Sequence, residues 1–290
     1  MKRILITGKN SYIGTSFEKY LSKWPDQYEV HTIDMHGNAW QDEDFSNYET
    51  IFHVAGIAHS DSGKIPPEKE KLYRSVNTDL AVATAKKAKD EGVAQFIYMS
   101  SIIVYGQSSA MGKEKIITKD TRPNPENCYG DSKLQADVQL HKLNDTSFKV
   151  VSLRPPMIYG KNCKGNFQTL VKIAKALPIF PDVKNQRSML YIENLCEFVR
   201  QIIDRELAGI FYPQNEDYVN TSEMVRLIGK ANGKNIRLTK LFNWALHLLR
   251  PFTGLVDKAF GSLTYDKRVS LLDEIDYQVK TLAESIEVAV

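Results

Sequence analysis

The sequence predicts an α/β fold in which a doubly wound parallel sheet is followed by a smaller C-terminal α/β lobe. Short β-rich runs alternate with helical patterns along the first half of the chain. The runs ILIT, IFHVA and FIYMS are apolar throughout, as in strands that are buried on both faces of a sheet. After residue 154 the alternation fades, and prolines and glycines separate shorter elements. We therefore expect a large domain over residues 1–160 and a smaller lobe over residues 161–290.

The elements of the large domain follow one another in a regular order. The predicted strands are Arg3–Thr7, Glu29–Ile33, Ile51–Ala55 and Gln95–Ser100, and the predicted helices begin after Tyr12 and span Thr78–Lys89. The segment of residues 35–48 is polar and leaves little room for a full helix and strand. We expect a shortened crossover there.

Composition limits the classes of protein that remain. The 290 residues are 42% hydrophobic and 25% charged, with a formal net charge of +3 and no basic block, so nucleic acid is not a predicted partner. The three cysteines are widely spaced and are not arranged like zinc ligands, which predicts no metal and favours a reducing cytoplasm. The first apolar run is too short for a signal peptide and is expected to be a strand. No apolar stretch approaches the roughly 20 residues of a membrane span.

The first predicted strand runs into a glycine-containing turn and then into a helix. Gly8 permits a tight turn, and Gly14 lets the helix pack closely on the sheet. Ser11 stands where the expected TGxxGxxG pattern has its middle glycine. Its side chain limits how closely the backbone can approach the phosphates, but its hydroxyl could donate a hydrogen bond to them instead. The helix start, with its dipole, favours a pyrophosphate at this place. A plain turn between a strand and a helix is the alternative interpretation of the same residues.

Asp34 closes the second strand about 20 residues after Gly14, where a carboxylate can accept hydrogen bonds from ribose hydroxyls and favours NAD over NADP. Asp44 and Phe45 could contact the adenine, although Asp44 could equally be a helix cap. A ribose could lie close to the backbone of Ala55-Gly56. The predicted cofactor-binding residues are Gly8, Ser11, Tyr12, Ile13, Gly14, Asp34, Asp44, Phe45, Ala55, Gly56 and Lys133.

Three side chains are the predicted catalytic group. Tyr129 and Lys133 are four residues apart in a segment with helical periodicity, so both point from one face. An ammonium beside a phenol, together with a positive nicotinamide ring, favours the phenolate and suits Tyr129 to take a proton from a sugar hydroxyl. Ser101 follows a central strand, at the end where open α/β sheets bind ligands. A solvated helix face is the competing explanation of the Tyr129–Lys133 pair.

These motifs together resemble the extended short-chain dehydrogenase/reductases, the NAD-dependent epimerase/dehydratase family. The similarity runs from Met1 to about residue 200, through TGxxxxxG, Asp34, HVAG, Val76-Asn77, SSxxVYG, PxxxYxxSK, RPPMIYG and RSMLYIENL. The resemblance implies a Rossmann-type domain and a catalytic group of Ser101, Tyr129 and Lys133, with Tyr129 as base and acid. It gives Asn77 a largely structural role.

Departures from the family pattern narrow the reaction that the resemblance implies. Dehydratases of this family carry an Asp-Glu pair directly after the catalytic hydroxyl residue, whereas this chain has Ile102-Ile103, which cannot protonate a leaving oxygen. Hexose 4-epimerases similar to this chain usually have Asn at the position of Met157 and a longer C-terminal lobe. Relatives with a similar PPMIYG segment act in bacterial surface-polysaccharide biosynthesis.

The reaction that remains is hydride chemistry on a nucleotide sugar. We expect an NAD-dependent epimerase that acts at C4 of a UDP-hexose or UDP-N-acetylhexosamine through a transient 4-keto intermediate. The alternatives are an NAD(P)H-dependent 4-keto sugar-nucleotide reductase and, on the same fold, a non-catalytic dinucleotide-sensing protein.

Substrate contacts are expected in the C-terminal half and after the predicted strand Ile51–Ala55. Arg187 resembles the family arginine that binds the diphosphate of a UDP-sugar, a task that suits a guanidinium fork, with a surface arginine as the alternative. Asn166 could help to hold the nucleotide, and His59 could reach the substrate. Helices Thr78–Lys89 and Glu126–Asn144 resemble the pair through which the family forms a homodimer.

The segment Leu238–Leu255 has apolar residues at helical spacing, with Lys240, His247 and Arg250 beside them. Three interpretations stay open: a helix packed in the small lobe, a contact between subunits, and a contact with a membrane surface.

Overall fold

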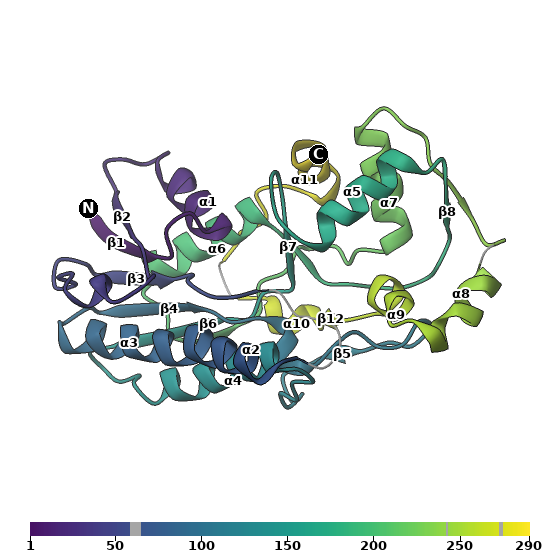
Figure 1. The fold of residues 1–290 in the computed structure, drawn as a ribbon. Helices are drawn as coiled ribbons and strands as arrows, with labels where there is room; N and C mark the ends of the chain where they lie inside the picture. The colour runs from purple at the N-terminus through teal and green to yellow at the C-terminus, as the bar shows by residue number, and fades with distance from the viewer. Residues whose placement is uncertain (59–64, 242, 273–274) are drawn as a thin grey trace. The chain divides into compact units, whose positions relative to one another are not determined.

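The computed structural model describes residues 1–58, 65–241, 243–272 and 275–290 (Figure 1). The chain divides into two compact units, and it passes between them more than once. The first unit comprises Met1–Gly106, Arg122–Pro155 and Leu195–Pro213, and the second comprises Gln107–Thr121, Pro156–Asn194 and Gln214–Val290. Within the described ranges, no helix is both long enough and apolar enough to cross a bilayer.

The first unit is built on one six-stranded sheet in the order β10-β6-β4-β3-β1-β2, and every neighbouring pair of strands is parallel. The strands are β1 (Lys2–Thr7), β2 (Tyr28–Ile33), β3 (Thr50–His53), β4 (Gln95–Met99), β6 (Lys149–Leu153) and β10 (Gly209–Phe211). β3 and β4 are completely buried, in agreement with their apolar sequence. The order reverses on either side of β1 and β3, so the predicted doubly wound sheet is confirmed.

Helices cover both faces of this sheet (Figure 1). Figure 1 shows α2, α3 and α4 on one face, and α1 and α6 on the other. They span α1 (Tyr12–Leu21), α2 (Pro67–Arg74), α3 (Leu80–Asp90), α4 (Cys128–His141) and α6 (Ile192–Asp204). The core beneath α3 and α4 combines small helix residues, such as Ala85 and Ala136, with strand aromatics, such as Phe96. Small side chains let the helices approach the sheet closely.

Two connections in the first unit differ from regular helices. The short connection after β2 contains only a 3₁₀ turn, Ala39–Gln41, whose Trp40 is buried, and this confirms the shortened crossover. A π-helical turn, η2 (Ser75–Asp79), joins α2 to α3, so the helix predicted to begin at Thr78 is continuous with an earlier one. Such turns widen a helix locally and are frequent at functional sites.

The second unit contains pairs of short parallel strands and several helices. The pairs are β7 with β9, β8 with β11, and β5 with β12. Its strands are β5 (Ile116–Ile117), β7 (Met157–Tyr159), β8 (Ile179–Pro181), β9 (Met189–Tyr191), β11 (Arg237–Thr239) and β12 (Thr264–Tyr265). Its helices are α5 (Asn166–Ala176), α7 (Thr221–Ala231), α8 (Asn243–Leu249), α9 (Leu255–Phe260), α10 (Lys267–Ser270) and α11 (Leu282–Ala289). A 3₁₀ turn, η4 (Arg250–Phe252), joins α8 to α9.

Candidate active site

The turn between β1 and α1 has the tight geometry that its glycines predict. Gly8 has a φ of +110°, and a Cβ added there would lie 2.9 Å from the Ala55 backbone nitrogen. Ser11 is the N-cap of α1, and its Oγ accepts a hydrogen bond from the Gly14 backbone N–H at 3.1 Å. The hydroxyl that replaces the family glycine therefore fixes the helix start and keeps its own proton to donate. Tyr12 and Ile13 form the first turn of α1.

Asp34 follows the last residue of β2, and its side chain is 56% exposed. Its carboxylate accepts hydrogen bonds from the His36 backbone N–H at 3.0 Å and from the His36 ring at 2.7 Å. These bonds, the backbone one first, lower the Asp34 pKa. Asp34 thus presents a negative charge to solvent at the carboxyl end of the sheet, where it fits a ribose and opposes a 2′-phosphate.

Asp44 and Phe45 occupy different environments. Asp44 accepts hydrogen bonds from the backbone and hydroxyl of Ser46, so it stabilises a local turn rather than a helix. Phe45 is fully buried in the core, and its backbone N–H donates to Glu91. A contact of these two residues with adenine stays a prediction.

The loop after β3 is connected to α4 by Asn77 in the π-helical turn. Asn77 Oδ1 accepts from the Ile57 backbone N–H at 2.8 Å, and its Nδ2 donates to Ser132 Oγ at 3.0 Å. Ala55 is buried and Gly56 is exposed. A Cβ added at Gly56 would lie 3.0 Å from Asn77 Oδ1 and 3.2 Å from Lys133 Nζ. A side chain at position 56 would therefore crowd both the Asn77 amide and the Lys133 ammonium.

Ser101 follows β4 and begins the 3₁₀ turn η3 (Ile102–Tyr105). Its Oγ accepts a hydrogen bond from the Ile103 backbone N–H at 3.3 Å, and the Ile102 backbone N–H donates to the Pro155 carbonyl at 2.9 Å. These bonds hold the serine at the carboxyl end of a central strand, and Ile102 is buried behind it. No carboxylate follows Ser101 directly, as the sequence shows.

Tyr129 is the second residue of α4, whose start is capped by Asn127 through a 2.8 Å bond from the Gly130 backbone N–H. The Tyr129 ring lies 6.1 Å from the ring of Tyr73. Burial raises the Tyr129 pKa above its usual value, and a hydrogen bond with the Ser101 side chain opposes this rise. The lowered phenol pKa that the sequence predicts is therefore not produced by the protein alone, and needs added positive charge.

Lys133 lies one turn after Tyr129 on α4 and is 5% exposed. Its Nζ donates to the Met99 carbonyl at 2.7 Å and lies 4.7 Å from the centre of the Tyr98 ring. Burial lowers the Lys133 pKa to about 8, while the charge of Asp137 opposes that change. The solvated helix face that competed with the functional interpretation is wrong for Lys133, because its ammonium is buried.

A buried polar network below Lys133 escaped the sequence analysis. Asp137 Oδ2 accepts hydrogen bonds from Arg154 Nε and from Ser100 Oγ, both at 2.9 Å. Arg154 also donates to the Tyr105 hydroxyl at 2.7 Å. Asp137 stands four residues after Lys133, a spacing that could have flagged it. Its second carboxylate oxygen is buried without a hydrogen-bond partner among the described residues.

His53 on β3 is a further buried titratable group near Lys133. Its Nδ1 pairs with Thr7 Oγ1 at 2.8 Å, and its ring stacks on Phe96 and Tyr98. Burial, with the charge of Lys133, lowers its pKa to about 3, so the ring is neutral. His53 thus lies in the sheet, within the strand Ile51–Ala55 that the sequence predicts.

The predicted substrate residues of the second unit lie on different elements. Arg187 is partly buried, and its Nε donates to the Gly261 carbonyl at 3.0 Å. Burial lowers its pKa, and it forms no ion pair within the part of the chain that the structure describes. Asn166 is the exposed first residue of α5, directly after Gly165. His59 lies outside the described residues.

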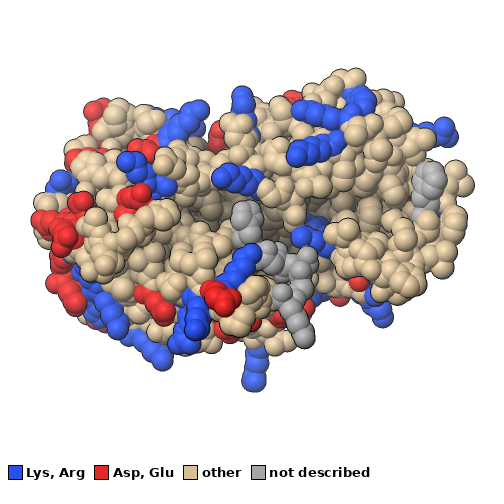
Figure 2. All heavy atoms as spheres, viewed as in Figure 1, with Lys and Arg blue, Asp and Glu red and all other residues tan. Residues whose placement is uncertain are grey.

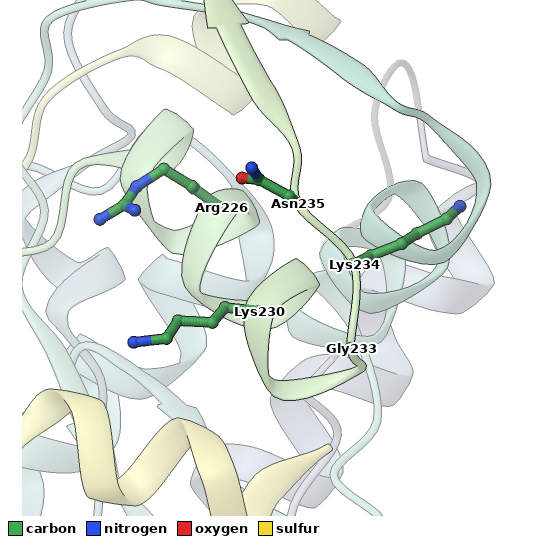
Figure 3. Close-up of a pocket in the computed structure, with 5 residues that line it drawn as sticks. All are labelled: Arg226, Lys230, Gly233, Lys234 and Asn235. Carbon is green, nitrogen blue, oxygen red and sulfur yellow. The ribbon is translucent and has the colours of Figure 1, made fainter.

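Neither the metal-ligating side chains nor the basic hollow of the second unit forms a second candidate site in the described chain. No group of three or more metal-ligating side chains comes together there, and Cys128, Cys163 and Cys196 are free thiols. A hollow of about 400 Å³ at the end of α7 is lined by basic side chains (Figure 3). Figure 3 shows Arg226 and Lys230 pointing to one side and Lys234 to the other. Arg226 pairs with Glu223, so the charges do not converge on one ligand.

The parallel sheet and the glycine turn after its first strand define an α/β protein of the dinucleotide-binding class. The chain belongs to the NAD dependent epimerase/dehydratase family, which it matches over residues 4–212. NAD is accordingly its cofactor, and the residues fit it: the Gly8 turn leaves no room for a side chain, α1 begins there, and Asp34 presents a carboxylate.

Comparisons with known proteins support the same family. The chain is 33% identical to a UDP-glucose 4-epimerase of Vibrio cholerae, over 91% of this chain and 87% of that protein. It is 26% identical to an N-acetyl-α-D-glucosaminyl-diphospho-ditrans,octacis-undecaprenol 4-epimerase of Escherichia coli O157:H7, over 67% and 58% of the two chains.

Solved structures share the fold at low sequence identity. A UDP-glucuronic acid 4-epimerase mutant of Bacillus cereus, in complex with NAD and a fluorinated UDP-sugar, has a TM-score of 0.73 at 17% identity, covering 99% of this chain and 97% of that one. A dTDP-4-dehydrorhamnose reductase of Bacillus anthracis, in complex with NADP, has a TM-score of 0.72 at 18% identity, covering 100% and 98%. Both likenesses establish the fold alone.

Proposed function

We propose that the chain is an NAD-dependent nucleotide-sugar epimerase that acts at C4 of a UDP-hexose or UDP-N-acetylhexosamine. One observation carries the proposal: Tyr129 shares a hydrogen bond with Ser101, which follows β4, and the Lys133 ammonium, one turn further along α4, donates to the Met99 carbonyl at the end of the same strand. The 33% identity with a UDP-glucose 4-epimerase, over most of both chains, supports the substrate class.

Bound NAD supplies a hydride acceptor for the substrate carbon and a hydride donor for its return. The Tyr129 phenol takes the hydroxyl proton at C4 when the carbonyl forms, and returns a proton when the hydroxyl is restored. Ser101 shares a hydrogen bond with Tyr129 and orients the substrate oxygen. The Lys133 ammonium is expected to favour the phenolate only together with the positive charge of the oxidised nicotinamide, because the protein alone leaves the Tyr129 pKa raised.

Residues of the second unit are proposed to hold the substrate. Arg187 is a partly buried cation without a carboxylate partner in the described chain, an arrangement that favours a diphosphate. Asn166, at the start of α5, is proposed to contact the nucleotide. His59 remains a candidate substrate contact by sequence. The cytoplasmic location and the homodimer through α3 and α4 also stay predictions.

The reaction is tested first with a panel of UDP-sugars. The epimerase proposal expects interconversion of C4 epimers without added cofactor, and release of stoichiometric NAD when the purified protein is denatured. Protein without bound nucleotide that consumes NADH steadily with a 4-keto sugar would contradict it in favour of a reductase. Binding of NAD with no turnover of any sugar would favour a dinucleotide-sensing protein.

The proposed base is tested by Tyr129→Phe, which removes one oxygen from a ring that keeps its packing. We expect turnover to fall by at least about 10³-fold, while the Kd for NAD stays within about twofold. Tyr48→Phe, on a tyrosine whose hydroxyl pairs with His31 away from this centre, is the matched control. Unchanged turnover in Tyr129→Phe would exclude the phenol as acid and base.

A further inference from the structure

The segment 241–255 in the second unit exposes a cluster of large apolar side chains. Across the described residues sixteen large hydrophobic side chains are exposed, and six of them fall in this stretch of the chain. Their exposed fractions lie between 53% and 87%. We call them the apolar patch: Leu241, Trp244, Leu248, Leu249, Phe252 and Leu255. Single exposed apolar residues are ordinary, but a contiguous group of this kind marks a surface that contacts something other than water.

The local structure fixes the apolar patch in place. Arg250 pairs with Asp257 at 3.0 Å and ties η4 to α9. Val256 and Phe260 on α9 are buried, and the Phe260 ring lies 5.8 Å from that of Phe180. At the other end, Asn243 Nδ2 donates to the Asp182 carbonyl at 2.9 Å. These contacts hold the segment against the rest of the second unit, while the side chains of the apolar patch stay exposed to solvent.

This arrangement decides between the interpretations of Leu238–Leu255 that the sequence left open. A helix packed in the lobe would bury Trp244 and Leu248, which lie four residues apart on one face of α8, yet they are 65% and 63% exposed. That interpretation is wrong for the apolar patch. In Figure 2 the surface over α8 and α9 is almost entirely uncharged, with Lys and Arg at its margins.

The charges around the apolar patch are mostly positive. Lys240, His247 and Lys258 are exposed beside it, and Lys184 is exposed in the hollow that Lys240 and His247 line. Of the neighbouring acids, Asp257 is already paired with Arg250, which leaves Asp182 as the acid that lines the same hollow as Lys184 and Lys240. Trp, Phe and Leu side chains rimmed by cations suit the boundary of an anionic bilayer, where rings enter the acyl region and ammonium groups meet phosphates.

A second copy of the chain fits this surface less well. A two-fold symmetric contact would bring the same patch of each copy together, and with it the same cations, Lys240 and Lys258. Like charges at the rim of an interface oppose association. We propose that the apolar patch docks the protein on the surface of an anionic lipid bilayer, without spanning it. This inference does not depend on the proposed reaction.

The test uses the full chain and vesicles of phosphatidylglycerol with phosphatidylcholine, compared with phosphatidylcholine alone, in a flotation assay. The protein should float with the anionic vesicles. The double substitution Trp244→Ser with Phe252→Ser should lower the partition coefficient on the order of tenfold or more. Val288→Ser, at an exposed valine on α11 of the same unit, is the matched control and should float like the wild type. UDP-sugar turnover should be the same in all three proteins.

Two further measurements separate a bilayer from other occupants. Brominated lipids should quench the fluorescence of Trp244, and Trp244→Phe should abolish this quenching because the other two tryptophans, Trp24 and Trp40, belong to the first unit and not to the apolar patch. Lys240→Ser with Lys258→Ser should reduce flotation on anionic vesicles to the level on neutral ones. The proposal is overturned if the protein floats with neither kind of vesicle. It is also overturned if sedimentation shows a dimer that Trp244→Ser with Phe252→Ser dissociates, while no vesicle binding is seen.

Discussion

Replacing Lys133 by Met removes a buried ammonium and keeps most of its aliphatic stem. Lys133 is 5% exposed, and burial lowers its pKa from 10.5 to about 8. The unfolded chain therefore binds this proton more tightly than the folded chain does. At about 1.4 kcal/mol for each pKa unit, the difference in proton-binding free energy is about 3 kcal/mol. That free energy opposes folding of the wild type at neutral pH, where the ammonium has to be buried.

The free-energy cost of burying the Lys133 ammonium disappears as the pH rises, because the lysine loses its proton. Between about pH 8 and about pH 10.5 the unfolded chain holds more protons than the folded chain, so the free energy of unfolding increases with pH in this window. Lys133→Met has no such proton. The stability of the wild type relative to the variant should therefore rise by about 2 kcal/mol between about pH 7 and about pH 9.5. The lost bond to the Met99 carbonyl adds an offset, but the offset does not depend on pH.

Urea unfolding followed by circular dichroism, on protein freed of nucleotide with charcoal, measures this difference at several pH values. Lys142→Met, at an exposed lysine directly after the same helix, is the control and should show almost no pH-dependent difference. A difference between wild type and Lys133→Met that stays constant from about pH 7 to about pH 9.5 would refute the reasoning, because a lysine with an ordinary pKa gives no slope there.

Three other changes test neighbouring parts of the site. Asp137→Asn leaves the buried Arg154 guanidinium without its counter-charge and should lower the free energy of unfolding by about 3 kcal/mol; the exposed Asp131→Asn on the same helix is its control, and equal stabilities would contradict the buried pair. Gly56→Ala would place a methyl group 3.2 Å from the buried ammonium and should lower kcat about tenfold or more at nearly unchanged Tm. Asp34→Ala should weaken the binding of NAD about tenfold and reduce the preference for NAD over NADP, with both Kd values measured by calorimetry. An unchanged preference would show that Asp34 does not select the cofactor.

The sequence could predict the sheet because its strands differ sharply from their surroundings. ILIT, IFHVA and FIYMS are short, wholly apolar and separated by helical patterns, so local information is enough to identify them. The pair Tyr129 and Lys133 was equally accessible, since a spacing of four residues places two side chains on one helix face.

Features that depend on tertiary contacts could not be predicted in the same way. Asp137 and Arg154 lie on different elements. The spacing from Lys133 places Asp137 on the same helix face, but nothing in either local segment shows that Arg154 is its partner in an ion pair that is 2% and 5% exposed. Phe45 follows an acidic residue in a polar stretch, yet the fold buries it completely. The pattern of Leu238–Leu255 shows which face is apolar, but a pattern cannot show whether anything covers that face.

The buried face of α4 explains why this helix carries so little amphipathic pattern. Its buried residues include Ser132, Lys133 and Asp137, and Lys133 and Asp137 are one turn apart along it. A helix that only had to be stable would place apolar residues there, because burying charges opposes folding unless they are paired and hydrogen-bonded. Here Met99, Ser100 and Arg154 supply the partners. A local rule that is broken in this way, and compensated by contacts from other elements, is the pattern expected where a structure is built for chemistry rather than for stability.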